Sequence, residues 1–384
     1  MPGPRVVLPF VGDSVGGAQI STVVFAKELA NNGYEPIFVI HEVGPLSEYL
    51  EQCRLPWIRF PLPTYVGQKS DLISYLKAYS ATSINIFRWL KQNGIDLVHG
   101  QDSRMNLTWC LPCRAANLPF IWHQRSKFSN SGLMRLIARL ASQIICISRY
   151  TLETQPKYLQ DKSQIIFNPF NIDQPLSEAE QPNNNLKAEL GEIAETRLIG
   201  FVGNLRPQKR PDVFVELAGH LAKALRGKLS FVIVGADQIA MQAELERKIK
   251  NFDPVPNVHF LGSRTPIRSI MSAFDVLVAP AVDEAFGRTL VEAMLLNVPV
   301  VATASAGHKE IITDQVTGWL VEPDDPKSLA LAVEEVLRCP EKAKEISSAA
   351  FNHARNNFSA KAHTLKITEI YRRQLSNKPN MERQ

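Results

Sequence analysis

The residue pattern with the clearest chemical meaning is a pair of glutamates, Glu284 and Glu292, on either side of a short segment that contains Gly287. The sequence predicts that a helix begins between them, and the first N–H groups of a helix are unpaired donors that favour an anion. Like charges repel, so the glutamates suit hydroxyl groups of two sugars on either side of a diphosphate. The predicted diphosphate-side residues between them are Phe286, Gly287, Thr289 and Leu290.

A basic loop in the second half of the chain offers the positive charge that a diphosphate needs. It reads Gly203-Asn204-Leu205-Arg206-Pro207-Gln208-Lys209 and directly follows a predicted strand. Cations such as Arg206 and Lys209 would stabilise the negative charge that accumulates on a leaving diphosphate during group transfer. The alternative interpretation is an ordinary solvated basic turn.

The first half of the chain offers weaker candidates at the ends of its predicted strands. His123 follows one strand-like run and His99 follows another, and parallel α/β sheets bind ligands at the carboxyl ends of their strands. Most isolated histidines are nevertheless structural. Gly16 and Gly17 precede a predicted helix, where small residues let backbone amides approach an oxygen ligand. An ordinary strand–helix turn explains these two glycines equally well.

These candidates depend on two series of alternating elements. Short β-branched runs alternate with longer segments of helical period, which is typical of parallel sheets with crossover helices. The predicted strands are residues 5–10, 35–40, 57–61, 96–99, 119–122, 143–147 and 164–167 in the first half, and 198–202, 229–234, 258–261, 276–279, 298–302 and 319–321 in the second.

The length of 384 residues and a change of texture predict two domains. We expect an N-terminal Rossmann-like domain over residues 1–172 and a linker over 173–196, which is rich in Gln, Glu, Asn and Pro. A second Rossmann-like domain should span 197–355, followed by a helical tail over 356–384 that packs back on the first domain. Two such α/β domains bind ligands at their strand ends, so their sites are expected to face each other across a cleft.

The charge of the chain is concentrated in one stretch. Residues 101–160 contain eight basic side chains and two acidic ones. This surplus indicates an anionic partner, either a phosphate-bearing substrate or an acidic membrane surface, unless it is an ordinary solvated face. Residues 133–140 form an amphipathic helix with two arginines one turn apart, which could rest on an anionic membrane or face the core.

The composition points to a cytoplasmic protein. No apolar run reaches the roughly 18 residues that a membrane-spanning helix needs, and the first residues do not have the pattern of a signal peptide. Five scattered cysteines argue against a disulfide framework and for a reducing compartment. We therefore expect a cytoplasmic location, either free or peripheral at the inner membrane face.

The glutamate pair also carries a family resemblance. Glu-x7-Glu, with Phe286-Gly287 inside it and Glu-Ala-Met at its end, resembles the donor-site motif of the retaining GT-B glycosyltransferases of family 4, also described as glycosyl transferases group 1. Other matches follow in the family's order from position 5 to about position 370. The resemblance implies two Rossmann-like domains and transfer of a sugar from a nucleotide-diphosphate-sugar with retention of configuration. Such enzymes act in glycan, polysaccharide or glycolipid assembly.

The resemblance assigns roles to the donor-side residues. Glu284 would contact the hydroxyl groups of the transferred sugar, Glu292 the ribose, Lys209 the diphosphate, and the backbone at Gly262 the base. The commonest family pattern has Arg where this chain has Asn204, which leaves the second cation open. Arg206 and Arg210 are the two candidates, and Arg206 is preferred because it shares the loop with Lys209.

The first domain would receive the acceptor. By resemblance, the Gly16-Gly17 loop lines the cleft and His123 projects into it near the reacting sugar. The expected catalytic residues are therefore His123, Lys209 and Glu284. The resemblance implies a UDP- or GDP-sugar donor and no cofactor. The acceptor would be a glycan, a lipid-linked molecule or a small molecule, and no nucleic acid is expected as a partner. No metal is expected either, because the histidines do not cluster with cysteines at zinc spacing.

Four alternatives remain. A nucleotide-sugar epimerase of the same fold is one of them, but the Lys209 loop together with Glu284 and Glu292 disfavours it. A dinucleotide-dependent oxidoreductase is suggested by Gly12, Gly16 and Gly17, but their spacing is not Gly-x-Gly-x2-Gly. A catalytically silent nucleotide-sugar-binding protein is suggested by Asn204. Trp109-Cys110-Leu111-Pro112-Cys113 resembles a thioredoxin-type motif, yet it falls inside a predicted helix instead of opening one.

Overall fold

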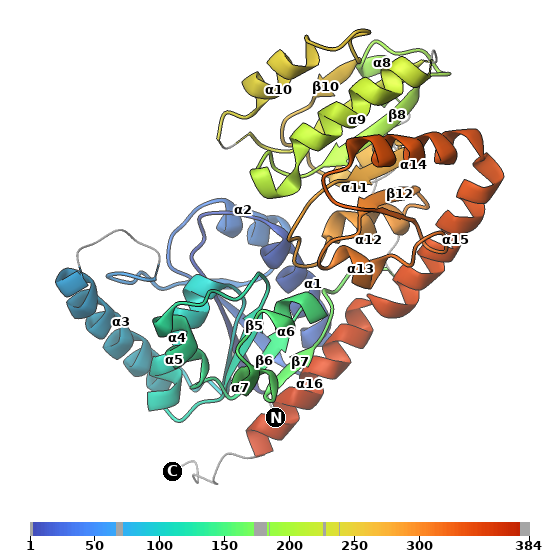
Figure 1. Cartoon of the computed structure of the whole chain (residues 1–384). Helices are drawn as coiled ribbons and strands as arrows, with labels where there is room; N and C mark the ends of the chain where they lie inside the picture. Colours follow the sequence, from blue (N-terminus) through green and yellow to red (C-terminus); the bar gives the residue numbers. More distant parts are fainter. Residues whose placement is uncertain are drawn as a thin grey trace. The chain divides into compact units, whose positions relative to one another are not determined.

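The computed structural model describes residues 3–66, 72–172, 183, 185–225, 228–237 and 239–376, and side chains within 72–78 are not described. The chain divides into two compact units (Figure 1). Unit 1 comprises Met1–Asn171 and Ser359–Gln384, and unit 2 comprises Ile172–Phe358. Part of the predicted linker, residues 173–182 and 184, lies outside the described residues, as does the end of the tail from residue 377.

Unit 1 is built on a seven-stranded parallel sheet with the order β3-β2-β1-β4-β5-β6-β7. The order reverses between β1 and β4, which pair in parallel with Val6 opposite Leu97. This reversal is the position at which doubly wound sheets bind ligands. The strands are β1 (Arg5–Phe10), β2 (Glu35–Ile40), β3 (Trp57–Arg59), β4 (Leu97–Gly100), β5 (Phe120–Gln124), β6 (Gln143–Cys146) and β7 (Ser163–Ile165).

Helices of unit 1 pack on both faces of its sheet, which is why its strands are continuous apolar runs. They are α1 (Gly17–Asn31), α2 (Pro45–Gln52), α3 (Leu72–Gln92), α4 (Ser103–Ala115), α5 (Gly132–Ala138), α6 (Arg149–Glu153), α7 (Lys157–Gln160) and α16 (Ala360–Ser376). In β1, Val7 faces one hydrophobic core, and Val6 and Leu8 face the other.

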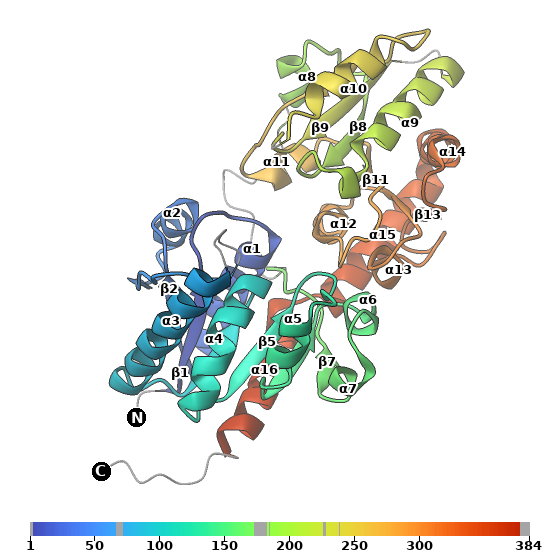
Figure 2. The same cartoon turned by 60° about the vertical axis from the view of Figure 1, so that its left-hand side comes forward.

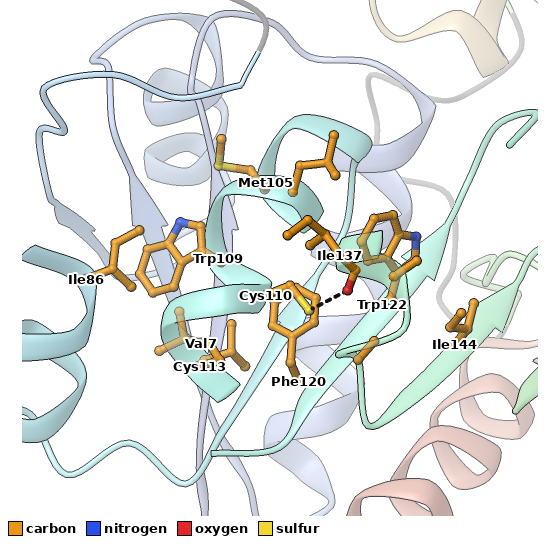
Figure 3. Close-up of a cluster of buried hydrophobic side chains, with 14 of the residues drawn as sticks. Val7, Ile86, Met105, Trp109, Cys110, Cys113, Phe120, Trp122, Ile137 and Ile144 are labelled. Carbon is orange, nitrogen blue, oxygen red and sulfur yellow. Dashed lines mark hydrogen bonds between the residues drawn. The ribbon is translucent and has the colours of Figure 1, made fainter. Parts of the chain in front are cut away.

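The two cores of unit 1 use different helices. In one, α3 and α4 run side by side (Figure 2), and Trp109 and Met105 of α4 are completely buried against the sheet (Figure 3). The other contains α1 and α16, the helix that follows unit 2 in the sequence. Ile367, Ile370 and Tyr371 of α16 are buried there with residues of α1 and β1.

Unit 2 is built on a six-stranded parallel sheet with the order β10-β9-β8-β11-β12-β13. Its order reverses between β8 and β11. The strands are β8 (Arg197–Val202), β9 (Leu229–Val234), β10 (Val258–Phe260), β11 (Val276–Ala279), β12 (Val300–Thr303) and β13 (Trp319–Val321). The helices are α8 (Leu186–Glu189), α9 (Pro211–Ala224), α10 (Gln242–Ile249), α11 (Ile267–Met271), α12 (Arg288–Met294), α13 (His308–Ile311), α14 (Pro326–Arg338) and α15 (Pro340–Asn357).

The predicted fold class, two doubly wound parallel-sheet domains, is confirmed. Every strand predicted from the sequence has a counterpart, and β1, β2, β9, β11 and β13 have the predicted bounds. The remaining strands differ at one or both ends by one or two residues, as expected where the side-chain pattern does not define the last hydrogen bond. None of the helices in the described ranges is both long enough and apolar enough to cross a membrane.

Candidate functional site

Two loops meet at the point in unit 2 where the strand order reverses. The loop after β8 contains a short 3-10 turn at Pro207–Lys209, and the loop after β11 contains Glu284. The N–H of Val282 donates a hydrogen bond of 2.9 Å to the carbonyl of Gln208, which joins the loops. The Nζ of Lys209 then lies 2.5 Å from the Oε2 of Glu284. The structure thus brings together two predicted site residues that are 75 positions apart in the sequence.

The environment of Glu284 keeps its carboxylate charged. Burial raises the pKa of this group, but the charge and hydrogen bond of Lys209 and the N–H of Gly287 lower it, and the net pKa lies below the ordinary value. An ionised carboxylate only accepts hydrogen bonds, which suits sugar hydroxyls. The ammonium of Lys209 has three N–H donors, and Glu284 uses one of them, so the others can reach a further oxygen.

Gly287 has a conformation that requires glycine. Its φ is +100°, and a Cβ at this position would lie 2.9 Å from Cδ2 of His308. It precedes α12, as predicted, so the first N–H groups of that helix are next to Glu284. One detail of the prediction is wrong: the N–H of Leu290 is already bonded to the carbonyl of Gly287 at 3.1 Å, so it is not a free anion donor.

The other predicted residues of this segment divide into backbone and side-chain roles. Phe286 is buried, with its ring edge-on to that of Phe358 at a centroid distance of 5.6 Å, so its side chain belongs to the core. Thr289 is half-buried in the first turn of α12. Glu292 forms an ion pair of 3.0 Å with Arg288, and both side chains are largely buried, at 16% and 14% exposure.

Two neighbours of the site were not among the predicted site residues. Arg288 could have been found from its i,i+4 spacing with Glu292, which places two side chains on one face of a helix. His308 lies behind Gly287, and burial lowers the pKa of its imidazole to about 4, so it is neutral at pH 7. Its Nδ1 is 3.1 Å from the carbonyl of Thr303. No local spacing signals that contact with Gly287.

The structure separates the candidates for the second cation. Arg210 has a φ of +53° and forms ion pairs with Asp212, at 3.2 Å, and with Asp324. Asn204, at the position of the family's usual arginine, accepts a hydrogen bond of 3.2 Å from the N–H of Ala236 and so supports the loop. Arg206 is exposed in the same loop as Lys209. Arg210 is therefore already paired with two carboxylates, those of Asp212 and Asp324.

Gly262 follows β10 and is open to a ligand. Its φ is +62°, and no heavy atom lies within 4 Å of the position where a Cβ would be. Its carbonyl accepts a hydrogen bond of 2.8 Å from the N–H of Gly235, and the N–H of Gly203 donates one of 2.8 Å to the carbonyl of Val234 beside it. The ends of β10 and β8 are thereby linked through backbone alone.

In unit 1, the glycine loop after β1 caps a helix. Gly16 is the N-cap of α1, and its N–H donates to Oε1 of Gln19 at 3.1 Å, while Gly17 is exposed. The same loop carries a two-armed ion pair that was not predicted. Asp13 accepts from Nη1 and Nη2 of Arg104 at 2.6 and 3.0 Å.

His123 differs from its prediction. It lies inside β5, one residue before the end of the strand, and its ring has 0% exposure instead of projecting from unit 1. The ring stacks between two others, with centroids 5.2 Å from His99 and 6.3 Å from His363. Burial lowers the pKa of His123 well below its ordinary value. Both predicted histidines thus belong to one buried group, because β4 and β5 are adjacent and in register.

The two cysteines of the thioredoxin-like motif are core residues. Cys110 and Cys113 lie within α4 and are completely buried (Figure 3). Burial raises the pKa of Cys110 to about 12 and that of Cys113 well above its ordinary value, the opposite of an activated thiol. Within the described part of the chain, no three His, Cys, Asp or Glu side chains are grouped to hold a metal ion.

Two family descriptions match the chain, one for each half. Residues 182–353 match Glycosyl transferases group 1, and residues 15–174 match Glycosyltransferase Family 4. A UDP-Gal:alpha-D-GlcNAc-diphosphoundecaprenol alpha-1,3-galactosyltransferase of Escherichia coli is 26% identical over 379 residues, which cover 93% of this chain and 94% of that protein. A D-inositol 3-phosphate glycosyltransferase of Kineococcus radiotolerans is 24% identical over 412 residues, which cover 95% and 92%.

Solved structures share the fold over nearly the whole chain. A glycosyltransferase from Rickettsia africae superimposes with a TM-score of 0.84 and 19% identity over 98% of this chain and all of that one. The Anabaena protein HepE, solved in complex with UDP and glucose, gives a TM-score of 0.79 and 21% identity over 96% of this chain and 100% of its own.

Proposed function

The chain belongs to the group 1 glycosyltransferases, which have the GT-B fold and use nucleotide sugars, and we propose that it transfers a hexose to an acceptor with retention of configuration. The observation that carries the proposal is the pair of Lys209 and Glu284, 2.5 Å apart at the strand ends of unit 2. A cation for the leaving diphosphate and an anion for the sugar hydroxyls are adjacent there. A dinucleotide-dependent oxidoreductase needs neither, and the comparisons do not favour it.

The donor would bind along unit 2. Its diphosphate would contact Lys209, Arg206 and the first amides of α12, where the glycine at 287 admits it closely. Its ribose would contact Glu292, because one Arg288 hydrogen bond leaves further lone pairs on that carboxylate. Its base would lie against the open backbone at Gly262. UDP is the first base to test, because a similar structure holds UDP and an E. coli relative is named for UDP-galactose.

The retaining outcome rests on the family resemblance of the glutamate pair. We assign no side chain as nucleophile, since Glu284 is bound to Lys209 and is better placed to hold the sugar. The leaving phosphate would help to deprotonate the acceptor, and positive charge at Lys209 would stabilise it. Unit 1 would supply the acceptor-side groups, the glycine loop at Gly16 and Gly17 and the histidine His123.

The acceptor would be a glycan, a lipid-linked molecule or a small phosphate-bearing molecule. The E. coli relative is named for a diphosphoundecaprenol acceptor and the Kineococcus relative for inositol 3-phosphate. The surplus of basic side chains in residues 101–160 supports an anionic acceptor of this kind. Glycan or glycolipid assembly in the cytoplasm is the corresponding role, and all five cysteines are unpaired, as suits a reducing compartment.

Thermal-shift binding tests the donor assignment. A ligand that binds the folded state raises its stability in proportion to occupancy, so a panel of nucleoside diphosphates and their sugars ranks the donors. We expect one nucleotide sugar to stabilise the wild type and to lose this effect in Glu292→Ala. The matched control is Glu334→Ala, which removes a similar i,i+4 pair with Arg338 on α14. A response to nicotinamide dinucleotides alone would overturn the proposal.

Helix α5 supports docking to an anionic membrane. Its Leu133 and Leu136 are 48% and 58% exposed, while Met134 and Ile137 are buried beneath them. The exposed Arg135 and Arg139 lie on the same helix surface, and the Arg139 guanidinium stacks 4.2 Å over the ring of Tyr158. Apolar side chains flanked by arginines are the pattern of a helix that binds an acidic lipid surface.

Liposome sedimentation tests this docking. The wild type should sediment with vesicles that contain anionic lipid and remain in solution with neutral ones. The double variant Leu133→Ser, Leu136→Ser should lose most of the binding. Leu331→Ser, which changes a leucine of unit 2 that is 57% exposed, should keep it. Equal partitioning of wild type between acidic and neutral vesicles would contradict the docking.

A further inference from the structure

A chain of hydrogen bonds connects α16 to His123 through the core of unit 1. The hydroxyl of Tyr371 lies 2.6 Å from Nδ1 of His99. The Nε2 of His99 lies 3.2 Å from Nδ1 of His123. All three side chains have 0% exposure, and the ring of Phe25 packs edge-on against both His99 and Tyr371. The chain ends at Nε2 of His123, which is buried and has no partner among the described residues.

Both histidines in this chain of hydrogen bonds, His99 and His123, are neutral. Burial lowers the pKa of His99 and of His123 well below the ordinary value, and the positive charge of Arg125 lowers both further. A neutral imidazole carries one proton, so one ring nitrogen donates and the other accepts. The position of one proton in the chain therefore determines the positions of the others.

The hydroxyl of Tyr371 determines which atom donates in each hydrogen bond of the chain from Tyr371 to His123. Its only hydrogen-bond partner within the described structure is Nδ1 of His99. Each direction leaves one buried donor without a partner among the described residues: the O–H of Tyr371 if Nδ1 carries the proton, and the Nε2–H of His123 if it does not. Once a substrate oxygen accepts from Nε2 of His123, only the second arrangement pairs every donor. The O–H therefore donates to Nδ1, which leaves the His99 proton on Nε2. That proton is donated to Nδ1 of His123, so the proton of His123 is on Nε2.

A third histidine in the same stack has the opposite form. The Nδ1 of His363 lies 2.7 Å from the carbonyl of Phe167. A carbonyl can only accept, so Nδ1 of His363 carries the proton and its buried Nε2 is a bare acceptor. Its tautomer is fixed by the main chain and does not depend on Tyr371.

We propose that Tyr371 and His99 are positioning residues that hold His123 with its proton on Nε2, so that His123 acts as a hydrogen-bond donor to a substrate oxygen and not as a general base. This inference rests on the proposed function, because a substrate oxygen is the partner that Nε2 of His123 lacks among the described residues. The device links the last helix of the chain to the acceptor-side residue. It gives α16 a part in the chemistry besides its packing.

Nitrogen-15 NMR of histidine-labelled protein at pH 7.5 reads the tautomers directly, because protonated and bare ring nitrogens have well-separated shifts. Resonances are assigned with His123→Gln and His363→Gln. In the wild type we expect the proton of His123 on Nε2 and that of His363 on Nδ1. A proton on Nδ1 of His123 in the wild type overturns the proposal without any variant.

Tyr371→Phe keeps the ring and removes the hydroxyl donor. We expect the Nδ1-protonated form of His123 to increase, while His363 stays unchanged as an internal control. The kcat of sugar transfer should fall about tenfold, with the KM for donor changed less than about twofold, since the donor site is in unit 2. An unchanged tautomer and an unchanged kcat would overturn the proposal.

Tyr34→Phe is the matched control. Tyr34 packs against Tyr371 with ring centroids 5.7 Å apart, and its hydroxyl is not in the chain. It also removes one hydroxyl and keeps the ring, and it should leave both the tautomer and kcat unchanged. If the predicted tautomers are found but no nucleotide sugar supports transfer by the wild type, the proposed function fails and the arrangement of protons stands.

Discussion

The two units place their polar groups in opposite environments. In unit 2 the groups at the site are charged pairs that keep some contact with solvent, such as Lys209 with Glu284, whose side chains are 31% and 22% exposed. In unit 1 they are neutral rings with no exposure, His99 and His123, joined to Tyr371. Unit 2 thus has charged pairs near its surface, and unit 1 has a neutral hydrogen-bonded network in its core.

This difference follows from the cost of burial. A charged pair taken fully out of water loses more solvation than its attraction returns, so cations meant for an anionic donor stay near solvent. A neutral network has no such penalty if its donors and acceptors are paired, and a dry interior holds it in one arrangement. The units should therefore respond differently to loss of charge, to acid and to changes in backbone or thiol chemistry.

Loss of charge in unit 2 should give the largest effect. Lys209→Ala removes the cation beside the leaving diphosphate and leaves Glu284 without its partner. We expect kcat/KM to fall by about 100-fold to 1,000-fold, the cost of removing one group that stabilises transition-state charge. Lys248→Ala, which breaks the pair with Glu216 on the outer surface of unit 2, is the control and should retain full activity. Equal losses in the two variants would refute a special role for Lys209.

Acid should weaken unit 1 before unit 2. Burial lowers the pKa of His41 to about 4 and of His363 to about 3, and it lowers the pKa of His99 and of His123 well below the ordinary value. In the unfolded chain these groups take up protons near 6.5, so the free energy of unfolding falls as pH drops from 6.5 toward each folded pKa. Each such histidine contributes on the order of 1.4 kcal/mol per pH unit.

Hydrogen exchange between pH 7.5 and 5, corrected for intrinsic rates, checks this order. Unit 2 has one buried histidine of this kind among its described residues, His308, with a pKa of about 4. Amides of β4 and β5 should therefore lose protection at a higher pH than those of β8 and β11. The reverse order would mean that the histidines of unit 1 are not neutral in the folded state.

A substitution at Gly287 distinguishes close approach of the donor from backbone strain at the site of unit 2. Gly287→Ala introduces a Cβ at a φ of +100° and 2.9 Å from His308. We expect a loss of about 1 to 3 kcal/mol in stability and weaker donor binding, measured by thermal shift and calorimetry. Gly191→Ala has a comparable φ of +72° with no atom nearby, so it should lose stability alone. Unchanged donor affinity in Gly287→Ala would exclude close approach of the donor there.

Much of the fold could be predicted, because strands that are buried on both faces of their sheet are continuous runs of apolar residues. The pairing of Lys209 with Glu284 was predictable in outline, since each follows a strand and the order of a doubly wound sheet reverses between them. The chain from Tyr371 to His123 was not. Its first hydrogen bond joins Tyr371 to His99, 272 positions away in the sequence. A histidine in an apolar strand has the same local sequence whether a distant helix covers it or leaves it exposed.

The smallest expected effect concerns the thiols. Cys110, Cys113 and Cys146 of unit 1 are buried, and burial raises the pKa of Cys110 and Cys146 to about 12, while Cys339 of unit 2 is exposed. Alkylation of the native protein should modify Cys339 and leave transfer activity within about 20% of its starting value. Mass spectrometry identifies the modified sites. Loss of activity with Cys110 or Cys113 alkylated and the fold intact would contradict a purely structural role.

The position of α16 in the chain has a consequence for biosynthesis. Synthesis of unit 1 begins before that of unit 2, yet Ile367, Ile370 and Tyr371, which complete the core of unit 1, are made after Phe358, the end of unit 2. All of unit 2, Ile172–Phe358, is synthesised before them. A nascent chain that has not reached Ser359 therefore holds every residue of unit 2 but leaves Phe25 and Leu29 without their final partners. Of the two units, the one whose synthesis begins earlier is completed later.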